Sequence, residues 1–378
     1  MNILFLTDGI TPYVTGGMQK HSLILVKLLL KKGIQITLVH CGYTNQAEFS
    51  TDYKAIFSEI ELKNLTIKFV PFLNKGRYPG HYIYENKVYS KRIYELFKNQ
   101  LNKFDIVYAQ GFTGWAFVKQ TMKPKVLVNF HGFEMFQKAA SLKVKFEHLL
   151  LRPFVKLICK KSDFVYSFGG QIDQILLKIG IPQSKILDQS NGIELKWIKD
   201  SFQNHKPLNF VFIGRNERRK GIEELTKSLI KLKEQNQINF NFTFIGPIEP
   251  NQTIVSNQIK YLGEIKSQTK IHQILSSSDV LVCPSYAEGM PTVILEAMAN
   301  GLAIITTDVG ASSKMINGNG IVLKNVEPQS ISQAIINLNS ISNSDLEDMK
   351  KSSLSLVKSK FIWEQVADDI IKDLKRIK

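Results

Sequence analysis

The chain has 378 residues, of which 44% are hydrophobic and 22% charged, and this balance is typical of a soluble globular protein with room for two domains. Its three cysteines, Cys41, Cys159 and Cys283, lack CxxC spacing and predict neither a zinc site nor a disulfide framework, which fits a reducing cytoplasm. We expect no signal peptide and no membrane span, because the opening segment lacks a basic stretch before a long apolar run and the apolar runs are short.

The formal net charge of +16 is concentrated in the first half of the chain. Residues 1–200 contain 28 Lys and Arg against 15 Asp and Glu (+13), whereas residues 201–378 contain 21 against 18 (+3). A positive field can attract nucleic acid, an anionic membrane or an acidic substrate, although genome base bias also produces Lys- and Asn-rich chains. No RNP motif, C₂H₂ finger or similar signature is found, so no nucleic-acid partner is expected.

The first half of the chain alternates apolar runs with helical patterns. Residues Asn2–Asp8 predict a strand, a helix runs to Lys32, and a second strand is predicted over Ile34–Cys41. This unit implies parallel strands joined by a right-handed crossover. Residues 44–103 are aromatic-rich and less regular, and further strands are predicted at Phe104–Gln110, Lys125–His131 and Phe164–Phe168.

The alternation restarts after a polar seam near Asp200–Pro207. Two doubly wound α/β domains are therefore predicted, over residues 1–200 and 201–360. The final segment, 361–378, predicts an amphipathic helix because apolar residues recur every four positions. The predicted strands of the second domain are Asn209–Gly214, Phe240–Gly246, Ile259–Ile265, Asp279–Pro284 and Ala303–Thr307, and its helices are Gly221–Gln235, Ser267–Ser276 and Pro291–Ala299.

The stretch SYAEGMPTVILEAMANG carries two glutamates at the carboxyl end of a predicted strand, where ligands of open α/β sheets bind. Pro291 is an early residue of the helix that follows, and the free N–H groups of such a first turn can bind an anion such as a diphosphate. Glu288 beside this turn can accept hydrogen bonds from sugar hydroxyls, and Glu296 can reach a more distant pair such as those of a ribose. The alternative for Glu296 is an ordinary surface charge.

The stretch IGRNERRKGIEEL lies at the end of another predicted strand. Gly214 ends the strand, Arg215 follows it, and Lys220 precedes the glycine that opens a helix. Two fixed cations suit a diphosphate and can stabilise charge on a departing nucleotide, a role that a metal ion often fills. Arg218 and Arg219 are expected to be solvent-exposed and without a role. The alternative is a basic cluster that merely flanks a helix.

Two weaker features lie in the first half. Gly16 and Gly17 precede a helix, where they allow close backbone approach to a ligand or form a simple turn. They are not part of GxGxxG, and no acidic residue closes the second strand, which disfavours a dehydrogenase. His131, in NFHGFE, follows a predicted strand and is an active-site candidate, although a lone histidine is usually structural.

These features in this order resemble the retaining family-4 glycosyltransferases of the GT-B fold, and the resemblance covers nearly the whole chain. The combination of E-x₇-E with GR…KG is highly specific, whereas GG and HG are weak separately. The last helix resembles the terminal helix of the family, which crosses back onto the N-terminal domain. The matching segments are GG at 16–17, HGFE at 131–134, NGIE at 191–194, GR…KG at 214–221 and E-x₇-E at 288–296.

The resemblance implies roles for individual residues. Glu296 would bind the donor ribose, Glu288 would meet the transferred sugar near His131, and Arg215 and Lys220 would hold the diphosphate. The expected catalytic residues are His131, Glu288, Arg215 and Lys220, and the expected donor-binding residues are Gly16, Gly17, Gly214, Arg215, Lys220, Glu288, Gly289, Met290, Pro291, Thr292 and Glu296.

The resemblance also implies an activity, namely retaining transfer of a sugar from a UDP- or GDP-linked donor to a glycan or lipid-linked acceptor. Polysaccharide, lipopolysaccharide or glycolipid biosynthesis would be the pathway class. We expect no metal and no cofactor, and Asp368 and Asp369 are no substitute for a metal-binding DxD because they fall in the C-terminal helix. The alternatives are another GT-B enzyme such as an epimerase, a silent nucleotide-sugar-binding protein, or a basic nucleic-acid-binding module.

The basic first half also predicts peripheral contact with an anionic membrane, at the inner face of the plasma membrane. Residues 141–163 mix basic and large apolar side chains, and Tyr78–Phe104 interleaves aromatic and basic residues. Residues 141–163 are expected to be helical, and Pro153 is expected to interrupt that helix. The alternative is a core-packing helix whose lysines are merely solvated.

Overall fold

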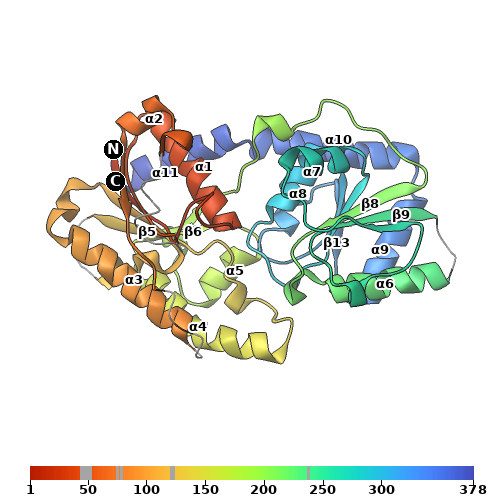
Figure 1. The fold of residues 1–378 in the computed structure, drawn as a ribbon, viewed down its shortest axis with the longest axis horizontal. Coiled ribbons are helices and arrows are strands. Elements are labelled where there is room, and N and C mark those ends of the chain that lie inside the picture. Colours follow the sequence, from red (N-terminus) through yellow and green to blue (C-terminus); the bar gives the residue numbers. More distant parts are fainter. Residues whose placement is uncertain (43–52, 74–75, 77–79, 120–123, 236–238) are drawn as a thin grey trace.

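A computed structural model describes residues 1–42, 53–73, 76, 80–119, 124–235 and 239–378. Two lobes stand side by side, and each contains one parallel sheet with helices on its two faces (Figure 1). The predicted class, two doubly wound α/β domains, is confirmed.

The first sheet has the strand order β3-β2-β1-β4-β5-β6-β7, with parallel neighbours throughout. The strand order reverses between β1 and β4. The carboxyl ends of these two strands therefore form a topological switch point, where ligands of such sheets bind. The strands are β1 (Asn2–Leu6), β2 (Gln35–His40), β3 (Leu65–Phe69), β4 (Ile106–Gln110), β5 (Lys125–Asn129), β6 (Phe164–Ser167) and β7 (Ile186–Asp188), and the helices are α1 (Gly17–Lys31), α2 (Glu59–Lys63), α3 (His81–Phe97), α4 (Leu142–Lys161) and α5 (Gln171–Lys178).

The second sheet has the order β10-β9-β8-β11-β12-β13, again with parallel neighbours. Its switch point lies between β8 and β11, the strands that precede the two motifs with charged residues. The strands are β8 (Leu208–Ile213), β9 (Phe240–Ile245), β10 (Ile259–Tyr261), β11 (Val280–Cys283), β12 (Ala303–Thr307) and β13 (Gly320–Leu323), and the helices are α6 (Ile222–Glu234), α7 (Gln268–Ser276), α8 (Thr292–Ala299), α9 (Pro328–Ser340) and α10 (Asn343–Lys360).

The last helix, α11 (Trp363–Ile377), returns to the lobe that holds the N-terminus (Figure 1). Its apolar stripe, including Val366, Ile370 and Leu374, is buried in the same core cluster as Leu25 and Leu29 of α1. Burial of a large aliphatic side chain contributes about 1.5–3 kcal/mol. This stabilisation explains why α11 packs on the N-terminal lobe although it directly follows the second lobe in sequence.

The two points where the chain passes between the lobes are paired with each other. Ile193 and Ile362 form an isolated parallel bridge, in which the Ile193 N–H donates to the carbonyl of Phe361 at 2.7 Å. Gly192 lies directly beneath Trp363, and a Cβ there would come within 2.5 Å of the indole ring. The NGIE segment is therefore a packing site as well as a connection.

Two expectations for the first lobe were wrong. Pro153 lies within α4 without ending it, and the helix continues to Lys161. The irregular region between the second and third predicted strands contains, in its described part, the regular elements β3 and the 17-residue helix α3. Its aromatic and charged side chains obscured the helical period because α3 buries polar groups, including Glu85 and Asn86, as well as apolar ones.

Candidate active site

A cleft of about 560 Å³ lies between the lobes and is lined from both sides. The first lobe contributes residues that follow β5 and the start of α1, and the second contributes residues that follow β8 and β11. The predicted residues that line the cleft are Gly17, His131, Gly214, Arg215, Lys220, Glu288, Gly289, Met290, Pro291, Thr292 and Glu296. Gly16 is not among the described lining residues and caps the N-terminus of α1 instead.

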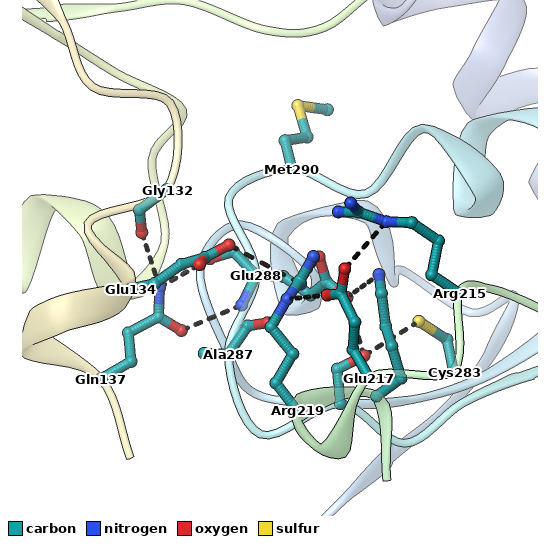
Figure 2. A network of polar contacts seen from close by, with 12 residues as sticks. Gly132, Glu134, Gln137, Arg215, Glu217, Arg219, Cys283, Ala287, Glu288 and Met290 are labelled. Carbon is teal, nitrogen blue, oxygen red and sulfur yellow. Dashed lines mark hydrogen bonds and ion pairs between the residues drawn. The ribbon is translucent and has the colours of Figure 1, made fainter. Parts of the chain in front are cut away.

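Glu288 lies in the loop between β11 and α8 and is only 5% exposed. Its carboxylate accepts hydrogen bonds from Lys220 Nζ at 2.6 Å and from Ser285 Oγ at 2.7 Å. It also accepts one from Arg219 Nη1 at 3.3 Å (Figure 2). Burial alone would raise the pKa of Glu288, but the two cations outweigh it and lower that pKa below its ordinary value. Glu288 is therefore an ionised acceptor in a largely enclosed site.

Lys220 and Arg215 follow β8 but differ in their surroundings. The side chain of Lys220 is 13% exposed and points at Glu288, whereas that of Arg215 is 72% exposed. Arg215 Nε forms an ion pair with Glu217 Oε1 at 2.9 Å. Of these two cations of the cleft, Lys220 is therefore enclosed and Arg215 lies on a solvated side chain.

Glu296 lies on α8 and also faces the cleft. Burial raises the pKa of its carboxyl group, and the attraction of Lys20 only partly opposes this shift. Lys20 belongs to α1 in the other lobe, and its Nζ is 3.7 Å from Glu296 Oε1. Lys20 is thus a loosely placed partner, and the Glu296 carboxylate retains acceptor capacity for ligand hydroxyls.

His131 is held with φ 62, a conformation that residues other than glycine rarely adopt and that indicates a constrained site. Its N–H donates to Asn129 Oδ1 at 2.8 Å, and Nε2 lies 2.7 Å from Gln110 Oε1. Burial, followed by the neighbouring His21, lowers its pKa well below the ordinary value. The ring is therefore neutral at physiological pH.

At Gly289 the backbones of the two lobes approach each other closely. A Cβ at this position would lie 2.4 Å from the carbonyl oxygen of His131 and 3.1 Å from Cα of Gly132. Only glycine fits, because these are backbone atoms that cannot move aside like a flexible side chain. The loop that carries Glu288 is consequently packed directly on the HGFE loop.

Comparison with known proteins agrees with this geometry. The model of Glycosyltransferase Family 4 matches residues 15–197, and that of Glycosyl transferases group 1 matches residues 194–353. The chain belongs to the family-4 glycosyltransferases of the GT-B fold. The family expected from the motifs is thereby confirmed.

Individual relatives of this glycosyltransferase are distant. The uncharacterized glycosyltransferase MJ1069 of Methanocaldococcus jannaschii is 25% identical, over 85% of this chain and 87% of that protein. The UDP-Gal:alpha-D-GlcNAc-diphosphoundecaprenol alpha-1,3-galactosyltransferase of Escherichia coli is 27% identical, over 62% and 63%. The solved structure of Anabaena Alr3699/HepE in complex with UDP and glucose aligns with a TM-score of 0.64 at 16% identity, over 99% of both chains, which shows a shared fold.

Arg219 of the glycosyltransferase was wrongly expected to be solvent-exposed. Its guanidinium is 22% exposed and lies 3.3 Å from Glu288 and 3.6 Å from Glu134, which comes from the other lobe (Figure 2). Arg218 turns the opposite way and pairs with Glu224 outside the cleft. A 3-10 turn over Arg218–Lys220 separates the two arginines, and no periodicity in the sequence signals which of them points inward.

Two further charged residues, one lining the cleft and one paired with a residue that lines it, were missed. Glu134 ends the HGFE motif and lines the cleft beside Arg219, and burial raises its pKa. Lys20 faces Glu296, and the available signal was its place one helical turn after Gly17 at the start of α1. Both come from the first lobe, so the charged groups of the second lobe meet partners across the cleft.

No helix among the described residues combines the length and the apolar character that crossing a membrane requires. Within the same residues, no three His, Cys, Asp or Glu side chains are grouped so that they could hold a metal ion.

Proposed function

We propose that this glycosyltransferase uses a UDP- or GDP-linked sugar as donor and retains the anomeric configuration, with no metal ion. The observation that carries the proposal is the cleft itself, where Lys220 and Glu288 lie together beside the first turn of α8 and Glu296 lies farther along that helix. Free N–H groups at a helix start and nearby cations suit a diphosphate, and paired carboxylates suit hydroxyl groups. The UDP-bound structure of the Anabaena neighbour supports a nucleotide donor.

The proposed reaction breaks the bond between the anomeric carbon and the β-phosphate oxygen of the donor. The acceptor hydroxyl attacks from the same face, and its proton passes to the departing phosphate. Lys220, Arg215 and Arg219 would stabilise the negative charge that develops on that phosphate, because fixed cations in an enclosed site need no reorganisation. Neutral His131 would lie beside the sugar without adding a charge.

Replacement of Glu296 by alanine should weaken binding of nucleoside diphosphate and nucleotide sugar alike. Loss of a charged hydrogen-bond partner costs about 1.5–3 kcal/mol, or roughly tenfold to a hundredfold in affinity. Isothermal titration with UDP and GDP, after a thermal-shift screen of nucleotide sugars, measures this change. The control is Glu347→Ala on α10, where an exposed glutamate pairs with the exposed Lys351.

Equal UDP or GDP affinity of the wild type and Glu296→Ala would refute the ribose assignment. Binding of a nucleotide sugar without any transfer to a panel of polyprenyl-diphosphate glycans would instead favour a silent binding protein.

We also propose that the acceptor is lipid-linked and that the enzyme docks on the cytoplasmic face of an anionic membrane. The name of the Escherichia coli relative describes a diphosphoundecaprenol acceptor, and this supports a membrane-borne substrate. Along α4, Leu142, Phe146, Leu149 and Leu157 are 84%, 62%, 48% and 38% exposed. Their spacing places them on one face of the helix.

Basic side chains border this apolar face of α4. Lys143, Lys145 and Lys156 are exposed, and each basic residue near an anionic leaflet contributes about 1 kcal/mol. Arg152 is different, because its Nε donates to the carbonyl of Met135 at 2.7 Å in the HGFE region. The other segment predicted to contact the membrane is Tyr78–Phe104. Tyr78 and Pro79 lie outside the described residues, and the remainder of the segment includes α3.

Replacement of Lys143, Lys145 and Lys156 by glutamine should reduce co-sedimentation with phosphatidylglycerol vesicles by about tenfold or more, because three charges contribute about 3 kcal/mol at most. Binding of the wild type should rise with the anionic lipid fraction and fall with salt. The control replaces three exposed lysines of α10, Lys351, Lys358 and Lys360, with the same change in net charge. Equal binding of the wild type to neutral and anionic vesicles would contradict the proposal.

A further inference from the structure

The loop that carries Glu288 is gripped by an amide side chain from the other lobe. Gln137 follows the HGFE motif, and its Nε2 donates to the carbonyl of Glu288 at 2.6 Å and to the carbonyl of Gly132 at 2.7 Å (Figure 2). Its Oε1 accepts the backbone N–H of Glu288 at 3.2 Å. One side chain therefore satisfies both backbone polar groups of Glu288 and ties them to the loop of His131.

A second amide holds the same loop two residues later. Asn191 of the NGIE segment donates from Nδ2 to the carbonyl of Met290 at 2.7 Å, and its backbone N–H lies 3.1 Å from Met290 Sδ. Asn191 is 6% exposed, so these bonds are shielded from competing water. Gln137 and Asn191 thus hold the backbone on either side of Gly289.

Asn191 is itself fixed by a buried hydrogen-bond chain. Its Oδ1 lies 2.8 Å from His21 Nδ1, and His21 Nε2 lies 3.0 Å from Gln189 Nε2. Gln189 Oε1 accepts from Tyr108 and from Asn129, each at 3.0 Å. Because Gln189 donates a hydrogen bond to Nε2 of His21, the ring proton lies on Nδ1. Nδ1 then donates a hydrogen bond to Asn191 Oδ1.

The protonation state of His21 agrees with this chain. Burial lowers the pKa of His21 to about 4, and the bond to Asn191 opposes that shift only in part. The ring stays neutral at neutral pH, as donation to one amide and acceptance from another require. All groups in this hydrogen-bond chain are therefore uncharged. The chain leads from Tyr108 of β4 and Asn129 of β5 to the backbone of Met290.

The hydrogen bonds of Gln137 and Asn191 set the position of the Glu288–Met290 loop of the second lobe relative to the first lobe. The Glu288 carboxylate belongs to the second lobe and His131 to the first, so their relative position depends on the interface between the lobes. We infer that Gln137 and Asn191 are positioning residues for sugar transfer, holding the Glu288–Met290 backbone in register with His131. The inference rests on the proposed nucleotide-sugar donor and makes no use of contact between either amide and that donor.

Replacement of Gln137 by alanine should lower kcat by roughly tenfold to a hundredfold, because it removes two hydrogen bonds to Glu288, each equivalent to a severalfold change, and misplacement near the reacting groups lowers the rate steeply. The affinity for UDP or GDP should stay within about twofold, since Lys220 and Glu296 remain in the second lobe. Asn191→Ala, which removes both side-chain bonds and adds no charge to the cleft that Asn191 also lines, should show the same split.

The matched control is Gln171→Ala. The Gln171 side chain also bonds across the lobes, from Nε2 to Asp308 Oδ2 at 2.7 Å, and this hydrogen bond involves no atom of Glu288, Gly289 or Met290. If Gln137 only strengthens the interface, Gln171→Ala and Gln137→Ala should lower kcat equally, and that result would overturn the inference. So would an unchanged kcat in Gln137→Ala. A wild type that neither binds UDP or GDP nor turns over any nucleotide sugar would refute the proposed function instead.

Discussion

Replacement of Lys220 by methionine should lower turnover of the nucleotide sugar by about a hundredfold to a thousandfold. Removal of one fixed group that stabilises transition-state charge has an effect of this size. Lys220 is also the nearest cation to Glu288, at 2.6 Å. Its loss leaves Glu288, which is 5% exposed, with Arg219 and Ser285 as its side-chain partners among the residues that the structure describes.

The pH dependence of Lys220→Met provides a second measurement. Burial raises the pKa of Glu288, and Lys220 is the largest influence that lowers it. Without Lys220 that pKa should rise, so the acid limb of the kcat/KM profile should move to higher pH. Lys220→Arg keeps the charge and should restore part of the rate, while Lys351→Met on the exposed face of α10 should leave both rate and profile unchanged.

If Lys220, Arg215 and Arg219 take the place of a metal ion, turnover of the wild type should also persist in excess EDTA. Activity lost on chelation and restored by magnesium or manganese would contradict the metal-free mechanism. Turnover of Lys220→Met within threefold of the wild type would remove Lys220 from the catalytic residues.

Replacement of Asp279 by alanine should destabilise the second domain by about 3–5 kcal/mol, because it strands a buried charge. Asp279 Oδ1 lies 2.7 Å from Lys350 Nζ, and both side chains are wholly buried. Asp279 also accepts from His205 and from the backbone N–H of Asn209, so it joins the linker and β8 to α10. Urea unfolding followed by tryptophan fluorescence and circular dichroism measures the change.

The adjacent lysine provides a matched control for this pair. Lys351→Met removes a side chain that is 60% exposed and should change stability by less than about 1 kcal/mol. Lys350→Met should match Asp279→Ala in the size of its effect, and the double variant Asp279→Leu with Lys350→Met should recover part of the loss. Equal stability of Lys350→Met and Lys351→Met would show that the buried pair has no special role.

The sequence alone determined the class of fold and the place of the site. Apolar runs and helical periods are local properties of the chain, and the carboxyl ends of parallel strands necessarily meet at one edge of a sheet. The spacing of Glu288 and Glu296 therefore located a cleft-facing loop and helix, and GR…KG located the neighbouring strand end. The period of α11 likewise indicated an apolar face before its partner α1 was known.

The tertiary structure decided which side chains meet. Arg218 and Arg219 are adjacent and chemically identical, yet a 3-10 turn sends only Arg219 to Glu288. Likewise, of the neighbours Lys350 and Lys351, one is wholly buried and the other is on the surface.

The cross-lobe contacts have the same origin. Gln137 and Glu288 lie 151 residues apart in loops of different lobes, and their hydrogen bonds exist only after two independently patterned domains pack together. Hydrogen bonds and ion pairs form or fail on differences of a few tenths of an ångström in the distance between donor and acceptor. Composition and periodicity record which residue types face a core, whereas such distances follow only from the packed backbone.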